Sequence, residues 1–203
     1  MTDDRLTASR LREIIEVSAL ITSTLDPLEI RRRAVEAAAR LAGAERGSLL
    51  LIDRRAKRLY FEVALGDDTS DLSRIAMVPE QGIAGSVVLS RTPVIVNDVH
   101  ADDRYDPSFD AKSGFRTRSM VCVPVSYKDR PLGVLEVINK LDGEFDQSDL
   151  EVTAALANHI AIALDNARAH ARLRRSFAEV AVYAALSALA FAAAGSWILS
   201  LGR

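Results

Sequence analysis

The chain has 203 residues, of which 49% are hydrophobic and 27% are charged, and its formal net charge is -2. This length accommodates one globular domain with additional segments, and the balance of residue types suits a chain that buries a core. The nearly neutral charge gives no support for nucleic-acid binding. Cys122 is the single cysteine of the sequence, so it has no disulfide partner within the chain and no metal-binding spacing.

The first predicted element is an amphipathic helix over residues 1–25. Its apolar side chains recur at helical spacing and form a stripe too wide for one small sheet to cover. We therefore expect residues 1–25 to form a dimerisation helix, and they contain no apolar core of a signal peptide. The side chains of the stripe are Leu11, Ile14, Ile15, Val17 and Ile21.

A second helix is predicted to begin after Asp26, a favourable N-cap residue, with Pro27 at the first helical position. Glu29 lies where the partner residue of a capping box belongs. The helical pattern stops at Gly43, which suits the position just after a helix.

Short apolar runs bounded by turn residues follow, and such runs are typical of strands. Two pairs of runs are separated only by short polar turns, which predicts two hairpins. A short helix is expected over 83–89, and residues 98–114, here called the lid segment, are predicted to form a polar loop with a short helix. Hairpins grouped in this way predict an α+β fold with a mainly antiparallel sheet. The predicted strands are SLLLID (48–53), RLYFEVAL (58–65), RIAMV (74–78), PVIV (93–96), RSMVCVPVSY (118–127) and LGVLEVINK (132–140).

The last predicted element is a long amphipathic helix over 147–178, which leads directly into an uncharged run at 180–202. A run of about 20 apolar residues is long enough to cross a membrane. Several arginines precede it, and positive charge beside a span favours the cytoplasmic side. We expect a single transmembrane helix at 179–202, with the globular part in the cytoplasm at a bacterial inner membrane. The alternative is a helix buried in a larger assembly, because the run is rich in alanine.

Three ordered segments carry a family resemblance: VPEQGIAGSVVLSRTPVIVNDV, RSMVCVPVSYKDRPLGVLEVINK and FDQSDLEVTAALANHIAIALDNARA. In this order they resemble a GAF domain. The resemblance implies a central antiparallel sheet of about six strands, with helices that carry dimer contacts on one face and a small-molecule pocket on the other. The expected division is a dimerisation helix (1–25), a GAF core (26–146), a signalling helix (147–178) and a membrane helix (179–202).

Two regions are candidate parts of a ligand site. A glycine-containing helix start offers free backbone N–H groups to an anion, and the lid segment combines donors, acceptors and rings that could hold a small molecule. Both regions also have a purely structural interpretation, as a turn and as a solvated loop. The candidate ligand-binding residues are Gly82, Ile83 and Ala84 at the helix start, and Asp98, Arg104, Tyr105 and Phe109 in the lid segment.

A second motif joins the last strand to the long helix. Asn139, Lys140, Phe145 and Asp149 are similar to a signature of cyclic-nucleotide-binding GAF domains, except that Leu150 replaces its final glutamate. The resemblance implies that Lys140 and Asp149 form a structural ion pair beside the pocket. A cyclic nucleotide is therefore one candidate ligand, although the departure at residue 150 weakens that assignment.

The expected function is that of a sensor or regulatory module and not of an enzyme. It would bind a small molecule, a partner protein or both, and would signal to a separate output protein through a parallel homodimer. One alternative is a structural anchor that recruits a partner and binds no ligand. A less favoured alternative is a thiol redox enzyme that uses Cys122, a residue that we expect to be buried in a strand. The three histidines are not clustered, so no metal site is expected.

Overall fold

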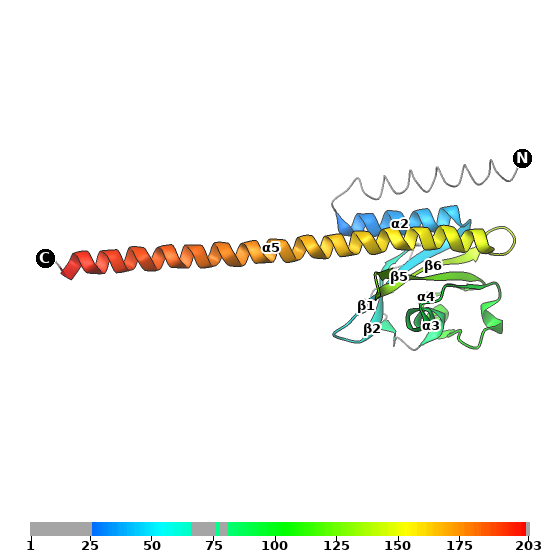
Figure 1. The fold of residues 1–203 in the computed structure, drawn as a ribbon. Coiled ribbons are helices and arrows are strands. Elements are labelled where there is room, and N and C mark those ends of the chain that lie inside the picture. The colour runs from blue at the N-terminus through cyan, green and yellow to red at the C-terminus, as the bar shows by residue number, and fades with distance from the viewer. Residues whose placement is uncertain (1–25, 66–75, 78–80, 202–203) are drawn as a thin grey trace, which may run out of the picture. The chain divides into compact units, whose positions relative to one another are not determined.

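The structure is a computed structural model that describes residues 26–65, 76–77 and 81–201 (Figure 1). The predicted helix at 1–25 lies outside the described residues. The chain divides into two compact units, Met1–Leu164 and Asp165–Arg203, which are considered separately below.

The first unit is built on one sheet in which every pair of neighbouring strands is antiparallel. Its six strands follow the order β3-β2-β1-β6-β5-β4, so β1 and β6 lie at the centre. The two predicted hairpins are present, and the α+β class with an antiparallel sheet is confirmed. The strands are β1 (Ala44–Asp53), β2 (Arg58–Ala64), β3 (Ala76–Met77), β4 (Val94–Val96), β5 (Met120–Tyr127) and β6 (Arg130–Lys140).

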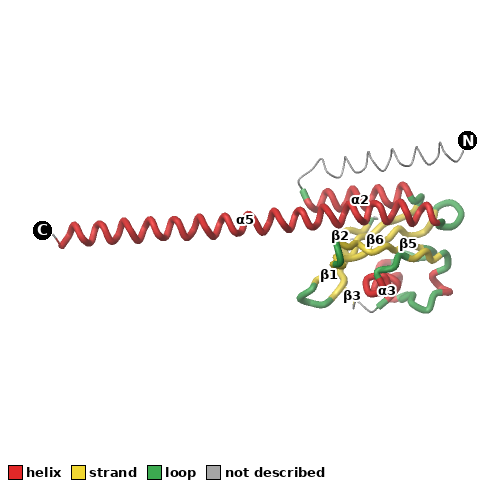
Figure 2. The backbone as a smooth tube through the Cα atoms, in the orientation of Figure 1, coloured by secondary structure: helices red, strands yellow, loops and turns green. Residues whose placement is uncertain are grey.

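Helices cover the two faces of this sheet differently. Helix α2 (Pro27–Leu41) and the start of α5 (Gln147–Leu201) pack on one face, and α3 (Gly82–Ser90) and α4 (Ser108–Ser113) lie on the other (Figure 2). A separate core lies on each side, with Leu156 of α5 fully buried in the first and Val87 of α3 fully buried in the second. The second face carries the lid segment, as the resemblance implies.

The central strand β6 alternates between the two cores. Leu135 and Val137 face the α2–α5 side, whereas Val134 belongs to the α3 side. Successive side chains of a strand point to opposite faces, so Glu136 also points toward the α3 side. An acidic residue therefore stands at a position where the pattern calls for an apolar one.

Helix α2 begins where the sequence predicts. The Asp26 carboxylate accepts a hydrogen bond from the N–H of Leu28 at 2.9 Å, and Pro27 is the first helical residue. The expected capping role of Glu29 is not observed. Its carboxylate instead accepts hydrogen bonds from Arg32 and Arg33, which lie one turn ahead on the same helix.

Gly133 allows the two central strands to approach each other. It lies opposite Leu51 in the β1–β6 ladder, and a Cβ added to it would lie 1.9 Å from the carbonyl oxygen of Leu50. A side chain at this position would therefore force the two strands apart.

The end of β6 connects the sheet to α5. Lys140 Nζ lies 2.5 Å from Asp149 Oδ2 and donates a further hydrogen bond to the carbonyl of Ala42 at 2.8 Å. Asp146 and Asp149 each accept the backbone N–H of the other, at 3.0 and 3.1 Å, which is the reciprocal pattern of a capping box. Lys140 thus ties the first turn of α5 to the sheet.

Asn139, the neighbouring residue, uses its whole side-chain amide. The Oδ1 atom accepts the N–H groups of Arg118 and Ser119, at 2.7 and 3.3 Å. The Nδ2 group donates to the carbonyl of Arg116 at 2.9 Å and to Glu45 at 3.0 Å. The chain that leaves the lid segment is therefore fixed to the end of β6.

In the second unit, α5 continues to Leu201. No helix among the described residues is long and apolar enough to span a membrane. Most side chains of the predicted span at 179–202 lie outside the described residues, so the span stays a prediction.

The Lys140–Asp149 pair gives a first test. Asp149 is 1% exposed, so Asp149→Ala leaves Lys140 without its partner in a poorly solvated site. We expect a loss of about 3 kcal/mol in the free energy of unfolding, measured by urea denaturation. Glu36→Ala, which breaks an exposed pair with Arg32, is the control and should cost less than about 1 kcal/mol. Equal losses in the two variants would refute a structural role for the buried pair.

Candidate functional site

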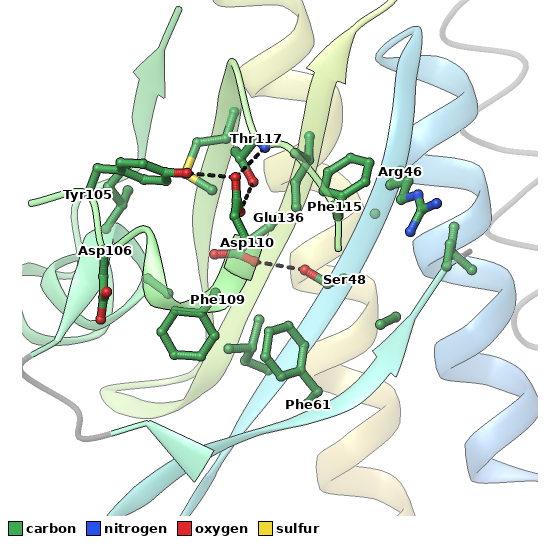
Figure 3. Close-up of a pocket in the computed structure, with 18 residues that line it drawn as sticks. Arg46, Ser48, Phe61, Tyr105, Asp106, Phe109, Asp110, Phe115, Thr117 and Glu136 are labelled. Atoms are coloured by element: carbon green, nitrogen blue, oxygen red, sulfur yellow. Dashed lines mark hydrogen bonds between the residues drawn. The ribbon is translucent and has the colours of Figure 1, made fainter. Parts of the chain in front are cut away.

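A cavity of about 120 Å³ lies between the α3 face of the sheet and the lid segment (Figure 3). Its walls come from β1, β2, α3, the lid segment and the two strands β5 and β6. Most of its lining is apolar, and its polar groups come from both the sheet and the lid segment. The lining residues are Arg46, Gly47, Ser48, Leu50, Phe61, Ala64, Leu65, Ile83, Ala84, Tyr105, Asp106, Phe109, Asp110, Phe115, Thr117, Met120, Glu136 and Ile138.

Glu136 forms the polar centre of the floor. Its Oε2 atom accepts a hydrogen bond from Ser48 Oγ at 2.7 Å, and Cys122 Sγ lies 3.8 Å from Oε1. These contacts follow from the register of the sheet, which places Ser48 on β1 and Cys122 on β5 directly opposite Glu136. Three adjacent central strands thus contribute one row of polar side chains.

Burial controls the electrostatics of this row. Glu136 is 5% exposed, and desolvation raises the pKa of its carboxyl group above the usual value, although the hydrogen bonds from Ser48 and Cys122 act in the opposite direction. None of the described cationic side chains forms an ion pair with Glu136. Burial, reinforced by Glu136, raises the pKa of the Cys122 thiol well above its usual value.

Asp110 fastens the lid segment over the cavity. Its carboxylate accepts the hydroxyl of Tyr105 at 2.6 Å, the N–H of Thr117 at 2.6 Å and the hydroxyl of Thr117 at 2.8 Å. Burial and this bond to Asp110 raise the pKa of Tyr105 to about 12, so the phenol remains a donor at neutral pH. Asp110 therefore joins the middle of the lid segment to Thr117, which lies shortly before β5.

Aromatic rings form much of the remaining wall. The rings of Phe61 and Phe109 are 6.4 Å apart between centroids and tilted by 55°. The guanidinium of Arg46 lies 4.3 Å from the centroid of the Phe115 ring, a distance typical of a cation–π contact. A flat apolar ligand could pack between such rings.

The structure brings some of the predicted ligand residues to the cavity and leaves others away from it. Ile83, Ala84, Tyr105 and Phe109 line it. The remaining three, Gly82, Asp98 and Arg104, are not among the lining residues, and each has a local role.

These local roles explain why the three residues stay outside the cavity. Gly82 opens α3 with a φ of 75°. Asp98 accepts the N–H of His100 and caps a short 3₁₀ turn. Arg104 pairs with Asp102 at 2.6 Å and donates a hydrogen bond to the hydroxyl of Ser86. The hydrogen bonds of a polar loop side chain can thus all go to its neighbours, which leaves none for a ligand.

Among the polar lining residues that the sequence analysis missed are Ser48, Asp110, Thr117 and Glu136. One of them carries a recognisable signal. Glu136 is the single acid within the apolar run of β6, and a charged residue in the middle of a central strand requires a polar environment. The other three are distinguishable only once the register and the path of the lid segment are known.

The antiparallel sheet carries α2 and the start of α5 on one face, and α3, α4 and a lined cavity on the other, which defines an α+β domain with a pocket. A family model described as GAF domain matches residues 24–165. The chain therefore belongs to the GAF domain family.

Similar proteins include a curated enzyme and two solved structures. The probable 3',5'-cyclic phosphodiesterase pde-5 of Caenorhabditis elegans is 28% identical over 148 residues, which are 68% of this chain but 20% of that protein. The GAF domain from a phosphoenolpyruvate-protein phosphotransferase of Coxiella burnetii has a TM-score of 0.74 at 16% identity, covering 80% of this chain and 96% of that one.

The free methionine-R-sulfoxide reductase from Neisseria meningitidis, solved with its substrate, has a TM-score of 0.68 at 18% identity. The match covers 80% of this chain and 92% of that one. At such identities the two structural matches establish the fold. The chain spans only a fifth of the phosphodiesterase, so the activity of that whole protein does not transfer with the match.

The raised pKa of Glu136 gives a pH test. The carboxyl group of Glu136 binds its proton more tightly in the folded state than in the unfolded state. Ionisation of Glu136 therefore lowers the free energy of unfolding, and this loss is absent below the usual pKa and complete above the raised pKa. We expect Glu136→Gln to gain stability relative to the unmodified protein as the pH rises from about 4 to about 8. Urea denaturation across this range measures the difference.

Glu144→Gln is the matched control for this test, because Glu144 is an exposed residue between β6 and α5. Its stability difference from the unmodified protein should stay small throughout. A pH-independent difference for Glu136→Gln would show that the buried carboxyl group titrates alike in both states.

Proposed function

We propose that this chain is a sensory module that binds a small organic molecule in the cavity and reports its occupancy to a separate output protein. The observation that carries the proposal is the cavity itself, in which a buried acid and several aromatic rings face a common space. A largely apolar pocket with a few convergent polar groups and a residue of shifted pKa is the usual form of a ligand site.

The contacts around the cavity provide a route for such a report. Asp110 connects Tyr105 to Thr117, and Asn139 holds the backbone of the residues on either side of Thr117. Lys140 follows directly and holds the first turn of α5. A ligand that alters the position of the lid segment would therefore act on the end of β6 and on the start of the helix.

We further propose that the chain signals as a parallel homodimer. Leu173, Phe177 and Val180 follow one another at helical spacing, and they are 56%, 72% and 63% exposed. Spacings of four and three residues place them on one stripe of α5, which matches the seam of a coiled coil. An exposed apolar stripe of this kind favours contact with a second copy of the same helix.

The proposal places the homodimer at a bacterial inner membrane, with the globular part in the cytoplasm. Two features of the sequence support this location: the uncharged run at 180–202, and the arginines that precede it.

Cyclic nucleotides are one candidate class of ligand. The name of the Caenorhabditis elegans relative and the motif at Asn139 and Lys140 both favour them. Among the described residues that line the cavity, only Arg46 is a cation that could contact a phosphate. The alternative of an anchor without a ligand predicts that no small molecule stabilises the domain.

We propose no catalytic role for the chain. A thiol redox activity would depend on Cys122, whose side chain is 0% exposed and whose pKa is raised. The thiolate is the reactive form of cysteine, so both features oppose a nucleophilic role. Cys122 is also absent from the residues that line the cavity.

Blocking the cavity tests the binding proposal. Ala64 lines the cavity and is half-buried, so Ala64→Phe would fill space that a ligand needs. Thermal denaturation should be followed with a panel that includes cyclic GMP, cyclic AMP, amino acids and aromatic amines. We expect at least one compound to raise Tm of the unmodified protein, and the shift to be lost in Ala64→Phe.

The control for this variant is Ala111→Phe, because Ala111 is exposed on α4 and does not line the cavity. Ala111→Phe should retain the shift. If no compound changes Tm, or if both variants respond alike, ligand binding in this cavity is refuted.

The apolar stripe tests the dimer. Phe177→Asp places a charge on the stripe and should weaken association at least about tenfold, measured by sedimentation of the full chain in detergent. Arg174→Asp introduces the same acidic residue at an exposed position of α5 that lies about a quarter turn from the stripe and outside the predicted span. Dimerisation should survive in this control. A monomeric unmodified chain at micromolar concentration would refute the proposal.

A further inference from the structure

Glu136 raises a question that the fold alone does not answer. A carboxylate that is 5% exposed, with no cationic partner among the described residues, is costly to keep ionised. Ser48 and Cys122 supply one hydrogen bond each, and a carboxylate can accept about four, so acceptor capacity remains on the side of the cavity. A positively charged ligand would supply the missing partner.

We propose that the cavity takes a single-ring organic cation, such as an aromatic amidine or a cyclic amine, whose charged nitrogen pairs with Glu136. This inference rests on the proposed function, because it specifies what the same cavity binds. It names the chemical class and not an individual compound.

The volume of the cavity sets the size of the ligand. A cavity of about 150 Å³ in another protein holds one benzene molecule. The cavity here measures about 120 Å³, which matches one ring with a small substituent and is too small for a nucleotide unless the lid segment moves. In the structure as it stands, one ring is the best fit.

The walls suit a flat ring with a positive charge. Figure 3 shows the rings of Phe61, Phe109 and Phe115 around the contact between Glu136 and Ser48. Aromatic faces attract cations as well as other rings, so these walls add to the attraction of the carboxylate. A neutral ring would gain only the packing contribution.

The charges around the cavity oppose an anion. Asp106, Asp110 and Glu136 line it, whereas Arg46 is the one cation among the described lining residues, and its guanidinium already lies over Phe115. Asp110 uses its oxygens on Tyr105 and Thr117, so it contributes negative potential without being open to the ligand. Asp106 accepts hydrogen bonds from the N–H of Ser108 at 2.9 Å and from the amide of Gln81, and it is less buried than Glu136. Glu136 is therefore the buried acid with acceptor capacity left for direct contact.

The pairing implies a pH dependence. The titratable and charged groups around Glu136 are Cys122 on β5, Arg46 on β1, Tyr105, Asp106 and Asp110 in the lid segment, and Arg104 near Cys122. A cation pairs only with the ionised form of Glu136, whose pKa is raised by burial. Affinity for a permanently charged ligand should therefore rise as the pH increases through that pKa.

Benzamidine and benzamide provide a matched pair of probes. They have the same ring and nearly the same shape, but only benzamidine is charged at neutral pH. Calorimetric titration of the full chain should show at least about tenfold tighter binding of benzamidine at about pH 8, and the preference should shrink toward about pH 5. This pH series uses the unmodified protein, so it remains decisive even if a variant fails to fold.

A substitution then assigns the preference to one residue. In Glu136→Gln the preference for benzamidine should fall to about threefold or less, which is the part that the aromatic walls supply, and the pH dependence of the ratio should disappear. Glu144→Gln, the same change at an exposed acid, should keep the full preference and its pH dependence. An undiminished preference for benzamidine in Glu136→Gln would overturn the assignment to this residue.

The remaining outcomes separate this inference from the proposed function. Equal binding of both probes to the unmodified protein, or binding of cyclic GMP with no binding of benzamidine, would overturn the cation inference and leave a ligand-binding cavity in place. No binding of either probe, together with no response in the panel used for Ala64→Phe, would overturn both.

Discussion

Asn139 and Lys140 hold the lid segment, the sheet and α5 in one arrangement. The side-chain amide of Asn139 accepts and donates hydrogen bonds to the backbone on either side of Thr117, and it also donates to Glu45. Lys140 contacts both Asp149 and the carbonyl of Ala42 at the end of α2. These bonds connect segments that are distant in sequence, and they lie at the edge of both cores. The cavity depends on them because they fix where the polypeptide leaves the lid segment.

The two faces of the sheet perform different tasks under this constraint. The α2–α5 face is closed by large apolar side chains such as Leu49, Leu135 and Leu156, which are fully buried. The α3 face has the same strands but carries Ser48, Cys122 and Glu136 in one row. Both faces therefore bury an apolar core, and the α3 face also leaves a space that is only partly filled.

Local patterns predicted the elements well. Hairpin strands and the first helical turn after Asp26 follow from short-range signals that tertiary packing did not override. The capping role expected of Glu29 failed because two arginines on the same helix compete for its carboxylate. The helix at 1–25 and the membrane span are still predictions, since the described residues include neither residues 1–25 nor most side chains of the span.

The site was harder to predict than the fold. Tyr105 and Phe109 were recognisable because aromatic rings in a polar loop gain stabilisation by packing against other parts of the protein or a ligand. Arg104 and Asp98 had the same polar character but are satisfied by near neighbours, which sequence alone does not reveal. Glu136 was passed over because its apolar neighbours identify a strand so clearly that the exception within it received no separate interpretation.

Gly133 maintains the hydrogen bond between Ser48 and Glu136 although it lies outside the site. It lies three residues before Glu136, or about 10 Å along the strand, and it allows β6 to lie close to the carbonyl of Leu50. Any side chain at this position would separate β1 from β6 and withdraw the hydroxyl of Ser48 from the carboxyl group of Glu136. A residue with no side chain, which is not among the residues that line the cavity, therefore maintains the hydrogen bond that moderates the raised pKa of Glu136.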